Sequence, residues 1–275
     1  MSRGACLAVL ISCALCLGAA PAEPSRAEQA GHGAMSLDQC ADDYLLALAP
    51  RSAIVAVSPQ AREPDAYMRD AAVGLTQLRP TLESILVAHP AVVVRYWTAS
   101  SGLVSALSAH GVRTVQLEDA HDFAGIRRNI RRVAAATDRR AQGEAMIAGM
   151  DAKLVKARGA WRGRRGLYLT PGGFTAGPGT LVFEILSAAG MADLEAHPGY
   201  QPVSLERLAL DPPDLVVRGF YDERPGGWEL GRRPVLDAIT RGATDVYLPA
   251  RLLGCPAWFS ADAVEMLAAR TGKGR

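Results

Sequence analysis

The chain has 275 residues, of which 49% are hydrophobic, and its formal net charge at pH 7 is +2. This composition is sufficient for an ordinary buried core and excludes an intrinsically disordered protein. The small net charge gives no field strong enough to indicate nucleic acid or an acidic membrane surface as a partner.

The N-terminus has the pattern of a secretory signal peptide. Arg3 precedes an apolar run over 5–17, and small residues at 20–22 offer a cleavage site. We expect residues 1–22 to be a signal peptide that is removed on export. In an alternative interpretation the signal is that of a lipoprotein, and Cys13 is acylated. No other stretch approaches the roughly 20 apolar residues that span a bilayer.

Removal of the signal leaves two cysteines, Cys40 and Cys255, in an oxidising compartment. They either form a disulfide or remain as buried free thiols. A disulfide requires that the fold bring the C-terminal segment back to the N-terminal lobe.

Short β-rich segments alternate with longer helical patterns, as is typical of parallel βαβ units. The first set has expected strands at 53–58, 91–96 and 113–117 and expected helices at 42–48, 81–89 and 102–110. The second set has expected strands at 166–170, 215–220 and 245–248 and expected helices at 181–189, 205–210, 235–239 and 261–270. In each set a helix that ends at a proline leads into a short apolar strand, and this repetition predicts two similar lobes.

The segment 122–161 contains no proline and has apolar residues at helical spacing. It predicts a helix that ends near Ala136 and a second helix over 139–158, which is about 30 Å long. Six arginines, at 127, 128, 131, 132, 139 and 140, are better explained by a solvated helix face than by nucleic-acid binding. The predicted fold is α/β, with two Rossmann-like lobes of parallel-rich sheets joined by one long helix. The expected boundaries are 34–121 for the N-terminal lobe, 122–160 for the linking helices and 161–270 for the C-terminal lobe.

The sequence contains no recognised catalytic or nucleotide-binding motif. The stretch 172–179 resembles a glycine-rich loop, but it lacks the lysine of a phosphate-binding loop, so a shaped binding loop is favoured. Five histidines, at 32, 89, 110, 121 and 197, are scattered, and no pair has the i, i+4 spacing that suits a metal site. We therefore expect no catalytic residue, no cofactor and no protein-bound metal ion.

In open α/β sheets, ligands bind at the carboxyl ends of the strands. Aromatic and hydroxyl groups gather at these positions, and they suit a large, partly apolar ligand with polar edges. The expected cleft residues are Asp38, Gln39, Cys40, Ser58, Tyr96, Trp97, Phe174, Thr175, Phe220, Tyr221, Cys255 and Trp258.

Three parts of the chain resemble the cobalamin and ferric-siderophore class of periplasmic binding proteins. They are residues 36–48 with 54–58, residues 173–181 with 188–206, and residues 253–256 with 259–264. The resemblance implies a periplasmic, monomeric protein that binds a metal chelate (an iron-siderophore, cobalamin or a haem-like compound) between two lobes. It also implies delivery of the chelate to an ABC permease with a cytoplasmic ATPase, and docking to permease arginines through Glu83 and Glu206. Where many relatives have a Gly-Gly pair after the closing cysteine, this chain has residues 256–258.

Three other functions stay open at this point. A receptor for a bare metal ion would need histidine and carboxylate ligands from both lobes, and the sparse histidines count against it. A secreted enzyme would use Asp38, Asp42 or Asp222 as acid and base, although nothing in the sequence pairs these residues. An exported scaffold would bind no small ligand.

Overall fold

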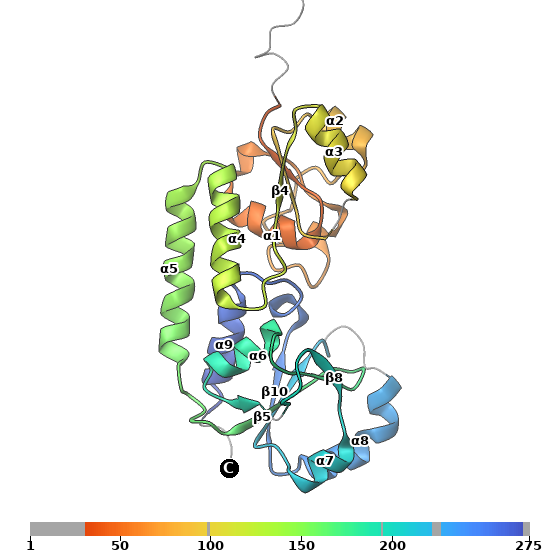
Figure 1. The fold of residues 1–275 in the computed structure, drawn as a ribbon, viewed down its shortest axis with the longest axis vertical. Helices are drawn as coiled ribbons and strands as arrows, with labels where there is room; N and C mark the ends of the chain where they lie inside the picture. The colour runs from red at the N-terminus through yellow and green to blue at the C-terminus, as the bar shows by residue number, and fades with distance from the viewer. Residues whose placement is uncertain (1–30, 98–99, 194, 222–226, 272–275) are drawn as a thin grey trace, which may run out of the picture. The chain divides into compact units, whose positions relative to one another are not determined.

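The computed structural model describes residues 31–97, 100–193, 195–221 and 227–271. Residues 31–275 form one compact unit. Two four-stranded parallel sheets, each flanked by helices, make up most of it (Figure 1). The predicted α/β fold with two parallel-rich lobes is therefore confirmed. The expected signal peptide, Cys13 and Asp222 lie outside the described residues.

The first sheet has the strand order β2-β1-β3-β4 and is parallel throughout. Its strands are β1 (Ala34–Ser36), β2 (Ile54–Ala56), β3 (Val92–Arg95) and β4 (Arg113–Gln116), and its helices are α1 (Gln39–Leu48), α2 (Leu82–Ala88) and α3 (Ser101–Ala109). The strands at 54–56, 92–95 and 113–116 match the predicted segments. The sequence pattern did not predict β1, which lies in the centre of the sheet.

Alternate residues of these strands face opposite sides of the sheet. Val92 and Val94 join the large core that includes helix α1, whereas Met35 and Val93 join a second cluster with residues of α2 and α3. Because both faces are covered by helices, β1, β2 and β3 consist mostly of apolar residues, whereas the edge strand β4 is largely polar. Polar side chains therefore lie at the carboxyl ends of β1, β2 and β3 rather than on the two covered faces of the sheet.

The second sheet has the order β10-β9-β5-β7 and is also parallel. Its strands are β5 (Arg165–Leu169), β7 (Ala192–Asp193), β9 (Leu215–Gly219) and β10 (Thr244–Leu248). Its helices are α6 (Leu181–Ala188), α7 (Leu205–Leu210), α8 (Gly227–Ile239) and α9 (Ser260–Ala268). Helix α8 begins before the predicted 235–239. The prediction started the helix after Pro234, because proline usually interrupts a helix, but α8 runs through it.

A small antiparallel pair, β6 (Phe174–Ala176) and β8 (Tyr200–Pro202), is added to this lobe. The sequence pattern predicted a shaped loop here, because Gly172, Gly173 and two nearby prolines indicate turns. The turn exists at 171–173, and a strand follows it.

The two sheets use the same strand order. In each sheet the first strand along the chain lies between the second and the third, and the fourth lies beside the third. The prediction of one supersecondary unit used twice agrees with this topology. Such an order has a switch point between the first and third strands, which is where α/β proteins of this topology bind ligands.

Helices α4 (Phe123–Ala136) and α5 (Arg140–Ala157) follow the first sheet and run side by side (Figure 1). The predicted break is present, since Asp138 adopts a left-handed conformation with φ of 57°. Gly143 allows the close approach of the two helices, because an added Cβ would lie 2.6 Å from the Cβ of Ala134. Helix α5 is about 27 Å long and also contacts α9.

The arginine cluster lies largely on α4, and three of its six members are paired with acidic residues. Arg127 bonds Asp151 at 2.5 Å and Arg131 bonds Glu144 at 2.7 Å, and both pairs join α4 to α5. Arg128 bonds Glu118 at 2.6 Å. These pairs agree with the interpretation as a solvated helix face. Among the described residues, no helix has both the length and the apolar character to span a bilayer.

Candidate functional site

The switch point of the first sheet brings Asp38 and Tyr96 together. Asp38 follows β1 and Tyr96 follows β3, and the Asp38 carboxylate accepts the Tyr96 backbone N–H at 2.7 Å. The same carboxylate caps helix α1 by accepting the Ala41 N–H at 3.0 Å. Asp38 is buried. It therefore fixes the position of Tyr96 rather than facing a ligand itself.

A cavity of about 330 Å³ lies between the two lobes beside Tyr96. The first lobe contributes Tyr96 and residues 119–121, and the second contributes residues 179–181, Gly199 and Tyr200. The closing segment, residues 253–256, forms a further part of the wall through Leu253, Gly254 and Pro256. Because both lobes supply its walls, it is named the interlobe cavity.

Two tyrosines and one acidic residue set the chemistry of the interlobe cavity. The Tyr96 hydroxyl donates a hydrogen bond to Asp119, and burial together with this bond raises the pKa of Tyr96 above its ordinary value. Burial and the charge of Asp119 raise the pKa of Tyr200. Both phenols therefore stay protonated at neutral pH. His121 Nε2 lies 4.0 Å from an Asp119 oxygen.

A disulfide and a hydrogen bond link the closing segment to the first lobe. Cys40, at the start of α1, forms a disulfide with Cys255, and both cysteines are buried. The Tyr44 hydroxyl donates to the Pro256 carbonyl at 2.6 Å. Of the two states considered for the cysteines, the structure contains the disulfide, with the C-terminal segment returned to the N-terminal lobe. Gln39 precedes Cys40 and is half-buried.

Trp258 lies in a packed group of aromatic side chains rather than in the wall of the interlobe cavity. It meets Tyr44 edge-on at 5.7 Å and Tyr67 at 5.9 Å, measured between ring centroids. Tyr67 in turn stacks on Phe259 at 4.1 Å and donates to Asp262 at 2.7 Å. This group fills the junction behind the closing segment and supports it. Trp97, by contrast, is exposed and packs edge-on against Tyr96.

The predicted residues of the second lobe are distributed over other places. Tyr221 lines a separate cavity of about 470 Å³ together with Tyr247 and Pro249, and Arg218 lies over both tyrosine rings. Phe220 adopts a left-handed backbone conformation, with φ of 64°, and is half-buried. Phe174 is exposed on β6. The structure does not bring these aromatic residues to the interlobe cavity.

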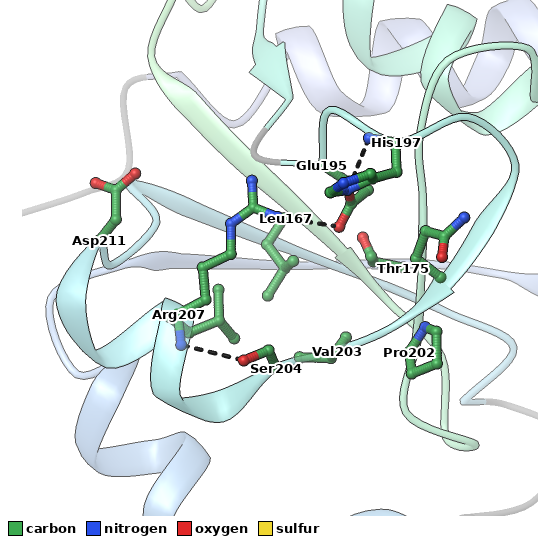
Figure 2. Close-up of a pocket in the computed structure, with 11 residues that line it drawn as sticks. Leu167, Thr175, Glu195, His197, Pro202, Val203, Ser204, Arg207 and Asp211 are labelled. Carbon is green, nitrogen blue, oxygen red and sulfur yellow. Dashed lines mark hydrogen bonds and ion pairs between the residues drawn. The ribbon is translucent and has the colours of Figure 1, made fainter.

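Thr175 lines a third cavity, of about 190 Å³, which is formed entirely by the second lobe (Figure 2). Figure 2 shows Glu195 between His197 and Arg207. Burial opposes ionisation of Glu195, but hydrogen bonds from His197 outweigh it and lower the pKa of Glu195. No described residue of the first lobe lines this cavity.

Ser58, at the end of β2, hydrogen-bonds a buried carboxylate. Asp42 accepts the Ser58 N–H at 2.9 Å and the hydroxyls of Ser36 and Ser58. Burial raises the pKa of Asp42 to about 7, although these hydrogen bonds partly oppose the rise. Its neighbour Asp43 accepts the Met68 N–H at 2.8 Å, and burial raises the pKa of Asp43 to about 7.

These carboxyls predict a pH dependence of stability. The folded protein holds protons on Asp42 and Asp43 that the unfolded chain releases above its ordinary pKa of 3.8. The free energy of unfolding should therefore fall between about pH 4 and pH 7, by up to about 4 kcal/mol for each carboxyl. Urea unfolding measured across this range checks the sign. Asp42→Asn should flatten the curve, and a variant curve parallel to wild type would contradict the assignment.

Glu83 and Glu206 occupy matching positions in the first turns of α2 and α7, and both are exposed. Each lies one helical turn before an aliphatic side chain that is almost fully exposed, Val87 in α2 and Leu210 in α7. The two lobes therefore present the same pair of a carboxylate and an aliphatic group.

Sequence reasoning missed Asp119, His121 and Tyr200. Asp119 and His121 follow β4, so the rule of carboxyl strand ends applied to that predicted strand would have found them. Tyr200 lies on β8, which the sequence pattern did not indicate. Among the described residues there is no group of three or more histidine, cysteine, aspartate or glutamate side chains that could hold a metal ion.

A family model described as "Periplasmic binding protein" matches residues 35–228. A search of curated proteins finds no significant match. Among solved structures, the apo periplasmic haem-binding protein RhuT from Roseiflexus sp. RS-1 is similar, with a TM-score of 0.69, 21% identity, and coverage of 88% of this chain and 98% of that one.

Two further structures have other ligands in their names. The vitamin B12-binding protein BtuF of Vibrio cholerae has a TM-score of 0.62 and 18% identity, and the match covers 88% of this chain and 96% of BtuF. An Fe3+-hydroxamate transport protein from Saccharomonospora viridis has a TM-score of 0.64 and 18% identity, with coverage of 88% and 94% respectively. At these identities the likeness establishes a shared fold.

Proposed function

Because the chain belongs to the family of periplasmic binding proteins, we propose that it is the solute-binding component of an ABC importer and that it binds a metal chelate in the interlobe cavity. Family membership also confirms the prediction of a binding protein rather than an enzyme. The observation that carries the proposal is a cavity lined by both lobes, to which each lobe contributes a tyrosine.

The character of the cavity supports a chelate over a bare ion. Protonated phenols at Tyr96 and Tyr200 offer aromatic faces and hydrogen bonds, which suit an organic ligand with polar edges. A bare ion would need several converging anionic or imidazole ligands. The interlobe cavity contributes one carboxylate and one histidine from its described lining, Asp119 and His121.

The enzyme alternative finds little support in the carboxylates that the sequence suggested for it. Asp38 is buried and holds the α1 N-terminus and the Tyr96 backbone. Asp42 is buried beneath Ser58. Both therefore have positioning roles, and Asp222 lies outside the described residues.

The proposal includes delivery to a permease that works with a cytoplasmic ATPase. Glu83 and Glu206, one on each lobe, would meet arginines of the permease, and we propose that the protein acts as a monomer in the periplasm. Support comes from their exposure and from their matching places in the two lobes.

A ligand panel tests the proposal. Purified protein is mixed with ferric haem, cyanocobalamin, a ferric hydroxamate siderophore, or free metal salts, and thermal unfolding and tryptophan fluorescence are recorded. A ligand that binds only the folded state raises the midpoint, so we expect a saturable rise with one chelate. Stabilisation by metal salts alone, or by nothing in the panel, would contradict the proposal.

Tyr200 offers a sharper test of where the chelate binds. Tyr200→Ala should weaken binding of the stabilising chelate about tenfold, which corresponds to about 1.4 kcal/mol. Tyr247→Ala is the matched control, since both side chains are 57% exposed and Tyr247 lines a different cavity. Isothermal titration gives both dissociation constants. Equal losses in the two variants would place the ligand elsewhere.

A further inference from the structure

His121 is held in the wall of the interlobe cavity by a loop that is fixed on both sides. Before it, the Glu118 N–H donates to Asn129 at 2.9 Å, and Asn129 returns a bond of 2.9 Å to the Glu118 carbonyl. After it, Asp122 caps helix α4 through the Gly125 N–H at 2.6 Å. The His121 ring itself remains 60% exposed, so it is accessible to a ligand in the cavity.

The Tyr96 hydroxyl, in the same cavity wall as His121, already has a hydrogen-bond partner. The Tyr96 hydroxyl donates to Asp119. His121 is the imidazole in the described lining of the cavity, and an Asp119 oxygen lies 4.0 Å from its Nε2.

Chelates differ in whether they accept such a donor. A hexadentate ferric hydroxamate fills all six positions of the iron, and cobalamin carries its own axial base. An iron tetrapyrrole occupies the four equatorial positions and leaves axial positions to water or to a protein ligand. A single well-placed imidazole therefore distinguishes the iron tetrapyrrole from the other two ligands.

We infer that the interlobe cavity takes an iron tetrapyrrole and that His121 is its axial ligand. The inference rests on the proposed function, because it names the chelate of the same site. On binding, the lone pair of one imidazole nitrogen forms a bond to the ferric ion and the axial water leaves. The oxidation state of the iron does not change.

The test is a titration of purified protein with ferric haem, followed by absorption and electron paramagnetic resonance spectra. Wild type should show a nitrogen-ligated haem. His121→Ala should lose that spectrum and weaken binding at least tenfold, and added imidazole should restore the spectrum. His197→Ala is the matched control, because His197 is likewise exposed but lines the cavity within the second lobe. Thermal unfolding of each variant confirms that it is folded.

An unchanged spectrum in His121→Ala would overturn the inference. Binding of ferrichrome or cyanocobalamin without binding of haem would also overturn it, while leaving the proposed function intact. Binding of none of the three chelates would overturn both, so the two failures are distinguishable.

Discussion

Replacing Cys40 and Cys255 together by alanine should lower the free energy of unfolding by about 3 to 5 kcal/mol. The two residues are 215 positions apart, so the disulfide closes most of the described chain into one loop and strongly restricts the unfolded ensemble. For a protein of this size the loss corresponds to a fall in midpoint of about 10 °C. Thermal and urea unfolding measure it.

Reduction of the wild-type protein provides the control. A reductant should lower the wild-type midpoint to that of the double variant and leave the double variant unchanged. The variant should also bind the chelate more weakly, since Gly254 and Pro256 in the wall of the cavity flank the disulfide. A double variant as stable as wild type would show that the bond does not stabilise the fold by closing this loop.

Reversing the charge of both Glu83 and Glu206 should reduce chelate uptake at least tenfold while leaving chelate binding unchanged. Both side chains are exposed and lie on α2 and α7, outside the interlobe cavity. If they meet arginines of a permease, each change to lysine places like charges together, which costs affinity and slows association. The variant Glu83→Lys, Glu206→Lys is compared with wild type in a transport assay.

Glu63→Lys is the matched control, because Glu63 is also an exposed carboxylate of the first lobe. It should transport normally. Isothermal titration with the chelate checks that all three proteins bind equally. Normal transport by the double variant would exclude these two residues as the docking pair.

The two-lobe fold could be predicted because the signals that specify it are local. A helix, a proline and a short apolar strand recur in each half, and the helical segment between them contains no proline. Strand β1 escaped prediction because its three residues, Ala34, Met35 and Ser36, include no β-branched residue, whereas the equally short β2 has isoleucine and valine. Strands β6 and β8 are also short, and Gly172 and Gly173 indicate a turn rather than the strand that follows it.

The site could be predicted only in part. The valine run 92–94 identifies strand β3, so Tyr96, which follows its carboxyl end, could be predicted as a site residue. Trp258 also follows a recognisable segment, but it packs against Tyr44 and Tyr67, contacts that depend on how distant segments meet. His121 was judged by its spacing from other histidines, a criterion for sites in which one helix supplies several ligands. A lone imidazole at a strand end needs the three-dimensional arrangement to be found.

A crystal structure of the protein with the chelate that stabilises it tests the assignment of the binding site. We expect density for the chelate between Tyr96 and Tyr200, bordered by residues 253–256. A chelate bound instead in the cavity of Thr175 or in that of Tyr221 would contradict the assignment of the interlobe cavity as the binding site.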